Sequence, residues 1–151
     1  MSAVAQRLRD AQLELPPLRP AAGGYVGWRR AGDLLFLSGQ GADGHVGRVG
    51  AELDVAAGRR AARDCMLNLL AQADAALGSL DAVTQVVKVL GFVACSEDFR
   101  DLPQVIDGAS EVLRAVLGAE AGAHARSAIG VQSLPLGFAV EIEMVLQVSG
   151  R

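Results

Sequence analysis

The feature that most constrains the fold is a β-branched run between two segments of helical periodicity. Residues 82–95, AVTQVVKVLGFVAC, are apolar on both faces of an extended chain, which is typical of a central strand covered on two sides. Residues 54–77 and 98–117 carry apolar side chains at spacings of three and four, the pattern of amphipathic helices. Such a chain needs a sheet for the strand and a face of that sheet for the helices.

The helices carry local signals at their ends. Asp54 is placed to cap the first long helix, and Gly78 is placed to end it. Pro103 must lie in the first turn of the second helix, because a proline further in breaks the backbone ladder. A shorter helix is expected at residues 2–14, where the prolines that follow stop it.

Four further strands complete the pattern. They are expected at residues 25–30, 34–38, 124–133 and 138–148. The order ββ-α-β-α-ββ predicts an α+β sandwich with helices on one face of a mixed sheet. The Gly-rich segment GQGADGHVGRVG lacks the Lys-Ser/Thr ending of a P-loop, which favours a flexible turn.

Alternation in the last two strands assigns charged residues to a face. In the final strand the apolar residues alternate strictly with a mixed set that includes Glu141 and Glu143, so the apolar set must face the helices. The same reasoning points Arg126 away from the helices. We therefore expect these three charges on the bare face of the sheet, where they line a pocket for a small charged molecule. The alternative is that all three are solvated surface charges.

Composition limits the classes of protein. A length of 151 residues suggests one domain, residues 1–151, in which residues 1–23 form an N-terminal extension. Hydrophobic residues make up 51%, and this excess of apolar surface favours burial between subunits. The net charge of −3 and the pI of 5.3 argue against a strongly basic nucleic-acid surface.

Cysteine content and the N-terminus indicate a soluble, cytoplasmic protein. Cys65 and Cys95 fall in unrelated contexts and are expected to be buried as small apolar residues. With two histidines and no close spacing among these residues, a zinc site is not expected. The N-terminus lacks the pattern of a signal peptide, and no run reaches the ~18 apolar residues that a membrane span needs.

Four motifs, taken together, resemble the YjgF/RidA family, whose members include enamine/imine deaminases. They are LLFLSGQ, ARSAIGV, SLPLG and VEIE, and the resemblance covers residues 24–148. Each motif is weak alone, whereas ARS followed by LP and then VEIE at this spacing is specific. The chain length and the IDGAS segment are more similar to a less-studied branch than to the best-characterised deaminases.

The resemblance implies a chorismate-mutase-like fold and a homotrimer with ligand clefts between subunits. It implies hydrolysis of reactive enamines or imines, such as 2-aminoacrylate, to keto acids and ammonia without a metal or an organic cofactor. The site residues that it implies are Tyr25, Ser38, Gly39, Arg126, Ala128 and Glu141.

Each implied residue has a chemical role. Arg126 would offer two parallel donors to a substrate carboxylate. Glu141 would orient or deprotonate the attacking water. Main-chain groups at Gly39 and Ala128 would bind the imine nitrogen, while Tyr25 would close the cleft. Ser38 aligns with the serine of the family's SGQ motif.

Three positions depart from the family pattern. Ala128 stands where typical deaminases have a cysteine, Pro103 where an asparagine is expected, and His124 where a proline is common. The departures leave a second function open, in which the same cleft binds a small carboxylate metabolite without turnover. A ribonuclease is a third reading, which the acidic pI and the lack of paired catalytic histidines weaken.

The spacing of the last two strands gives one geometric prediction. If they pair as a hairpin about Leu136, Arg126 opposes Leu146, and Glu141 lies five residues further along. At ~3.4 Å per residue this separation is about 17 Å, too far to hold one small molecule. We therefore predict that Arg126 and Glu141 cooperate only across a subunit boundary.

Overall fold

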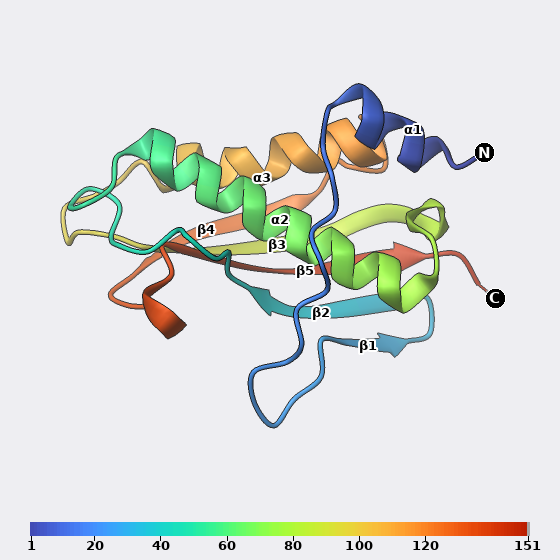
Figure 1. The fold of residues 1–151 in the computed structure, drawn as a ribbon, viewed down its shortest axis with the longest axis horizontal. Helices are drawn as coiled ribbons and strands as arrows, with labels where there is room; N and C mark the ends of the chain where they lie inside the picture. Colours follow the sequence, from blue (N-terminus) through green and yellow to red (C-terminus); the bar gives the residue numbers. More distant parts are fainter. Residues whose placement is uncertain (151) are drawn as a thin grey trace.

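A computed structural model describes residues 1–150 as a mixed five-stranded sheet with its long helices on one face (Figure 1). The last residue of the predicted domain, residue 151, lies outside the described residues. The helices are α1 (Ala3–Asp10), α2 (Val55–Leu77) and α3 (Leu102–Leu117), with short 3₁₀ turns at Leu80–Ala82 and Pro135–Gly137. The strands are β1 (Trp28–Ala31), β2 (Leu34–Gln40), β3 (Val83–Ala94), β4 (Ala125–Val131) and β5 (Val140–Val148).

The strand order is β1-β2-β5-β3-β4, in which only the β3–β4 pair is parallel. The expected hairpin between the last two strands is therefore wrong, because β3 lies between them. The reason is burial: every second residue of β5, from Val140 to Val148, is buried, so this strand takes a central place. β4 follows the α3 crossover and forms the edge of the sheet.

The structure confirms the predicted capping residues of α2 and the predicted position of Pro103 in α3. The Asp54 side chain accepts the Ala57 N–H at 2.8 Å, and Gly78 ends α2 with a φ of 77°. Pro103 lies in the first turn of α3. That helix begins four residues later than expected, and α1 ends at Asp10 rather than near residue 14.

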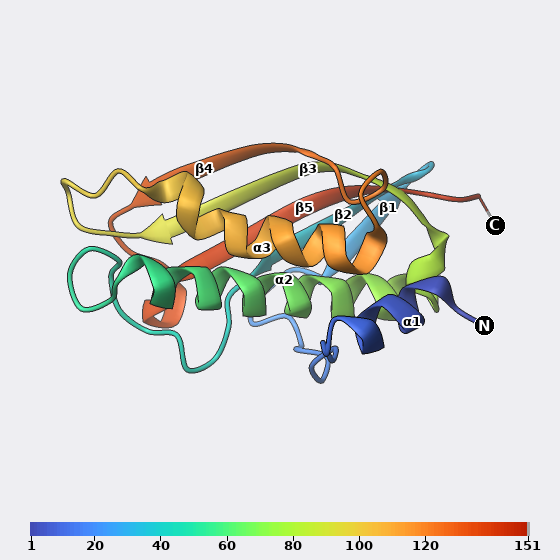
Figure 2. The same ribbon diagram turned by 90° about the horizontal axis from the view of Figure 1, so that it is seen from above.

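The core lies between the sheet and the pair α2–α3, which run side by side (Figure 2). Two glycines permit the close packing. A Cβ on Gly108 would lie 2.3 Å from the main-chain oxygen of Arg59, and one on Gly91 would lie 2.5 Å from Ile106 Cδ1. The backbone of α3 therefore packs directly against that of α2, and Ile106 of α3 packs directly against the backbone of β3.

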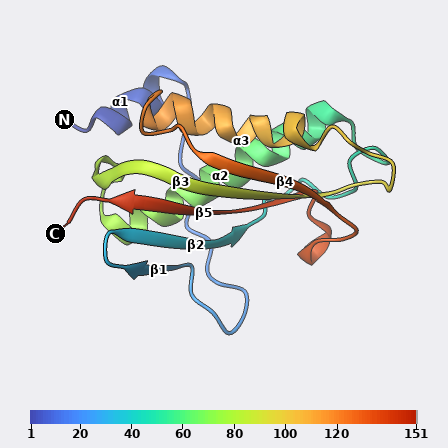
Figure 3. The same cartoon turned by 180° about the vertical axis from the view of Figure 1, so that it is seen from behind.

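Among the described residues 1–150, no helix lies on the other face of the sheet (Figure 3). The expectation that β3 is covered on two sides holds for one face only within this chain, because Val87 is exposed. Phe36 and Ile129 are also exposed apolar residues. The bare face therefore exposes apolar side chains beside the charged residues Lys88, Glu141 and Glu143.

The segment before β1 contacts the helical layer. Val4 is buried, and its N–H donates to Asp81. The chain then crosses α2 on its way to β1 (Figure 1), where Gln72 of α2 donates to the Arg19 carbonyl at 2.7 Å. Within residues 1–150, no helix combines the length and the hydrophobicity that crossing a bilayer requires.

Candidate functional site

Arg126 points toward the helices, not toward the bare face as expected. Its Nη1 donates to Asp107 at 2.8 Å and to Ser110 at 3.0 Å, both on α3, and its Nη2 donates to the Pro103 carbonyl at 3.3 Å. The alternation was misread because β4 is an edge strand under a closely packed helix. A Cβ on Gly130, on the same side of β4, would lie 2.8 Å from Cys95 Sγ, so small residues face α3 and Ile129 faces out.

The Arg126 guanidinium has N–H donors that its contacts with α3 do not use. Of the five N–H bonds of an arginine side chain, the three contacts with α3 use three. Within residues 1–150, Nε–H and one Nη2–H have no hydrogen-bond partner. The side chain is 20% exposed, so it is held in place without being closed off.

Two of the departures from the family pattern lie beside this guanidinium. Pro103 lacks the expected amide, yet its carbonyl oxygen accepts from Arg126. Ala128 follows Arg126 on the same side of β4 and packs against the core. This cluster thus brings together Arg126 and Ala128 of the predicted site.

Glu141 and Gly39 form a second cluster on the bare face. A Cβ on Gly39 would lie 3.0 Å from Glu141 Cδ, so the glycine leaves room for the carboxylate. Burial, and then the neighbouring Glu143 charge, raise the pKa of Glu141 above its usual value. A carboxylate of this kind holds a proton at higher pH than an ordinary glutamate does.

Ser38 and Tyr25 lie near this second cluster along the chain. The Ser38 hydroxyl donates to the Val26 carbonyl at 2.6 Å, and its main-chain N–H donates to Gly27 at 2.9 Å. The residues after Tyr25 therefore run beside the end of β2. Tyr25 itself is exposed, and its hydroxyl accepts the Ala22 N–H at 3.4 Å.

One chain does not bring Arg126 and Glu141 together. Val89 of β3 pairs with Arg126, whereas Phe92 pairs with Glu141. Three residues along and two strand spacings across give a Cα separation of about 14 Å. The two side chains also lie on opposite faces of the sheet, so a ligand that needs both must draw them from different copies of the chain.

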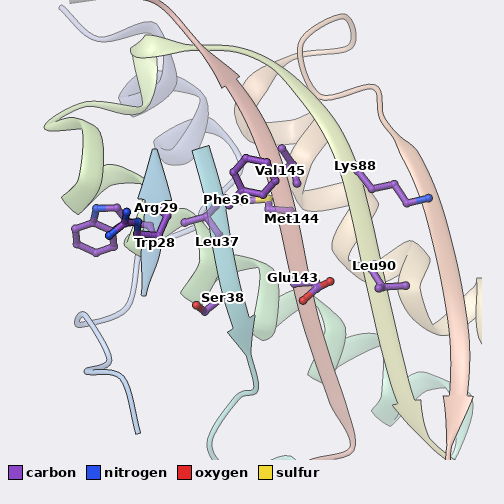
Figure 4. Close-up of a pocket in the computed structure, with 10 residues that line it drawn as sticks. All are labelled: Trp28, Arg29, Phe36, Leu37, Ser38, Lys88, Leu90, Glu143, Met144 and Val145. Carbon is purple, nitrogen blue, oxygen red and sulfur yellow. The ribbon is translucent and has the colours of Figure 1, made fainter. Parts of the chain in front are cut away.

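A depression of about 230 Å³ opens on the bare face between β2, β5 and β3 (Figure 4). Ser38 is the one predicted site residue that lines it, alongside Glu143. Its wall also holds Lys88, the only lysine of the chain, whose Nζ donates to Ser127 at 3.4 Å. A lone lysine within an apolar strand is a sequence signal that could have marked this position.

Sequence reasoning also missed the residues that hold Arg126. Asp107 and Ser110 follow Pro103 at intervals of four and three residues, a spacing that places them on one helix face. Their opposition to β4 depends on the parallel pairing of β3 with β4, which the sequence did not reveal. Within residues 1–150, no three His, Cys, Asp or Glu side chains gather as they would around a metal ion.

Comparison with known proteins gives the family. The sequence profile described as endoribonuclease L-PSP matches residues 17–148. Protein TCP17 of Trypanosoma cruzi is 40% identical, over 97% of this chain and 94% of its own length.

Two solved structures show the same fold. The protein Atu1372 of Agrobacterium tumefaciens, whose function is unknown, is 39% identical with a TM-score of 0.90, over 97% of this chain and 92% of its own. The YjgF gene product of E. coli is 28% identical with a TM-score of 0.61, over 86% of this chain and 92% of its own. The chain therefore belongs to the endoribonuclease L-PSP family, the YjgF/RidA family that its motifs predicted.

Proposed function

We propose that this protein hydrolyses carboxylate-bearing enamines and imines, such as 2-aminoacrylate, to keto acids and ammonia. The observation that carries the proposal is the Arg126 guanidinium, which α3 holds by three hydrogen bonds while two of its N–H donors have no partner among residues 1–150. Two donors on one rigid cation suit a carboxylate, which accepts two parallel hydrogen bonds. The resemblance of the sequence motifs to the YjgF/RidA family implies the same substrate class.

The chemistry needs a water molecule and a proton acceptor. After the enamine takes its imine form, water adds to the C=N carbon, a proton passes to the nitrogen, and ammonia leaves the tetrahedral intermediate. Glu141 is suited to take the proton of the attacking water, because its raised pKa brings it closer to neutrality. Gly39 has no side chain, which allows the Glu141 carboxylate to lie directly against the backbone of β2.

A shared site follows from the separation of the two clusters. Arg126 and Glu141 lie on opposite faces of one sheet, about 14 Å apart by strand geometry. We propose that Arg126 of one copy and Glu141 of another meet in a homotrimer. The exposed apolar side chains of the bare face support such an assembly.

A second candidate is binding of carboxylate metabolites without turnover. The Arg126–Asp107 ion pair favours it, because part of the cation's charge is already balanced inside the chain. Pro103 and Ala128 also remove two side chains found in typical deaminases. In this case Arg126 would still grip the ligand, but no product would form.

Ribonuclease activity, which the family's description names, has less support. The two histidines engage separate partners, since His45 contacts Asp64 and His124 contacts Ser110. They do not form a pair of acid and base groups. RNA cleavage that persists in Arg126→Ala after further purification would argue against a nuclease site at Arg126.

One assay separates the first two functions. 2-Aminoacrylate is generated in situ, and its loss is followed with the wild type, with Arg126→Ala, and with Arg60→Ala as a control at an exposed arginine on α2. We expect acceleration by the wild type and by the control, and loss of about 100-fold in Arg126→Ala, as removal of two charged hydrogen bonds implies. A wild type no faster than buffer that still binds pyruvate would identify a binding protein.

A further inference from the structure

A chain of hydrogen bonds extends inward from Arg126 to a histidine. Ser110 Oγ, which accepts from Arg126 Nη1 at 3.0 Å, lies 2.8 Å from His124 Nε2. On the other side of the ring, Nδ1 lies 2.7 Å from the Gly122 carbonyl. The chain thus links the loop before β4, the middle of α3 and the guanidinium.

The direction of each hydrogen bond is fixed by chemistry. A carbonyl oxygen can only accept, so His124 Nδ1 carries the proton. Nε2 of a neutral ring is then an acceptor, and the Ser110 hydroxyl donates to it. With its hydrogen committed to the histidine, the Ser110 oxygen presents its lone pairs to Arg126. His124 therefore determines which way the Ser110 hydroxyl points.

The surroundings of His124 favour the neutral form of the ring. Burial, followed by the positive charges of Arg114 and Arg126, lowers the pKa of His124 below its usual value, although the Gly122 hydrogen bond opposes the shift. A protonated ring would donate from both nitrogens, and the Ser110 hydroxyl would lose its acceptor. The neutral tautomer is thus the one that supports the contact with Arg126.

Ser110 is not placed to act as a nucleophile, in spite of its histidine partner. It is only 3% exposed, and its oxygen already accepts from Arg126. A nucleophile needs room beside its oxygen for the substrate. The pair His124–Ser110 therefore acts on the guanidinium rather than on a substrate.

We propose that His124 is a positioning residue for Arg126, acting through the Ser110 hydroxyl, and that it sets the guanidinium orientation from which a carboxylate is bound. The proposal rests on the function proposed above for Arg126. It assigns a role to His124, which stands where a proline is common in the family. It also explains why this half-buried polar ring has both nitrogens engaged.

The binding test uses pyruvate, the keto acid product of 2-aminoacrylate, in isothermal titration calorimetry. His124→Leu removes the acceptor for the Ser110 hydroxyl and is expected to weaken pyruvate binding about tenfold. The amide oxygen of His124→Gln can still accept from Ser110, and this variant is expected to stay within about twofold of the wild type. His45→Gln is the control at the other histidine.

A double-mutant cycle tests whether the effect passes through Ser110. Ser110→Ala is expected to weaken binding about as much as His124→Leu, and the double variant is expected to be no worse than either, because the two residues act in series. Losses that multiply in the double variant, or wild-type affinity in His124→Leu, would overturn the proposal.

A nitrogen-15 NMR readout separates this inference from the proposed function. The ring nitrogens of His124, assigned with His45→Gln, are expected to show Nδ1 protonated and Nε2 unprotonated. The Arg126 Nη signals are expected to shift in His124→Leu but not in His124→Gln. If the wild type does not bind pyruvate, the proposed function fails, and unchanged Nη signals in His124→Leu would then overturn the positioning role as well.

Discussion

At the scale of the residue, burial moves two ionisable groups in opposite directions. The pKa of His124 is lowered, chiefly by burial, and that of Glu141 is raised, chiefly by burial and then by Glu143. Both shifts disfavour the charged form. The shift of the histidine favours its neutral form, which can accept a hydrogen bond, while the pKa of the glutamate is brought nearer to the pH at which a proton acceptor works well.

The histidine shift predicts a pH dependence of stability. Because the folded pKa lies below the ordinary value of 6.5, the unfolded chain binds the proton more readily. The contribution of the neutral ring is present above that value and is lost as the pH falls toward the folded pKa. We expect the urea midpoint of the wild type to fall, relative to His124→Gln, between about pH 7.5 and about pH 5.5. An unchanged difference between the two proteins would contradict this.

A second residue-scale prediction concerns Asp107. Its carboxylate contacts Arg126 and repels an incoming anion, whereas an asparagine keeps an oxygen acceptor without the charge. We expect Asp107→Asn to tighten pyruvate binding about threefold, the size of a Coulomb interaction across ~7 Å in a solvated site. Glu111→Gln, an exposed carboxylate of α3 that pairs with Arg59, is the control. Weaker binding in Asp107→Asn would show that its charge is needed to hold the guanidinium.

At the scale of the element, the sequence predicted both ends of α2 correctly but not the pairing of the last two strands. The cap at Asp54, the stop at Gly78 and the place of Pro103 depend on a few neighbouring residues, and all three were predicted. The central place of β5 was missed, because the chain can pair its last strand with either β4 or β3 and a turn sequence does not decide between them. Burial along the whole of β5 decides instead.

The candidate site could likewise be predicted from the sequence only in part. Glu141 and Gly39 lie side by side, since the neighbouring strands β5 and β2 carry them. Arg126 was assigned to the wrong face, because hydrophobic alternation assumes that large apolar residues point inward. On β4 the inward positions are small or charged, and α3 supplies polar partners for the arginine.

The contact between α2 and α3 gives a stability prediction. Gly108→Ala would gain about 1 kcal/mol of helix propensity but would place a Cβ against the Arg59 carbonyl, a backbone atom that cannot rotate away. Overpacking of this kind costs about 1–3 kcal/mol, so we expect a net loss of about 1 kcal/mol in urea unfolding. Gly24→Ala, where no atom lies within 4 Å, should change stability by less than about 0.5 kcal/mol. Equal effects of the two substitutions would show that the helices can separate.

At the scale of the whole molecule, the bare face of the sheet exposes apolar side chains that a second copy of the chain could cover. Phe36, Val87 and Ile129 are exposed there, beside the depression lined by Ser38 and Glu143. Burial of this face between copies would remove apolar surface from water and bring a second chain to Glu141. The proposed shared site therefore requires the proposed trimer.

Light scattering tests the assembly. We expect a solution mass near three times the chain mass of 15.6 kDa, and a substitution of Ile129 by Glu is expected to lower it by burying an unpaired charge. A wild type that stays at the mass of one chain at micromolar concentration would contradict the trimer.

The measurement that tests the central claim most directly uses two inactive variants in one assembly. Arg126→Ala and Glu141→Gln are each expected to leave 2-aminoacrylate decay near the buffer rate. When the two chains are co-expressed and assemble at random, roughly one quarter of the shared sites combine an intact Arg126 with an intact Glu141, so about a quarter of wild-type activity should return. A mixture no more active than its two components, beside an active wild type, would place both residues in the site of a single chain and contradict the account.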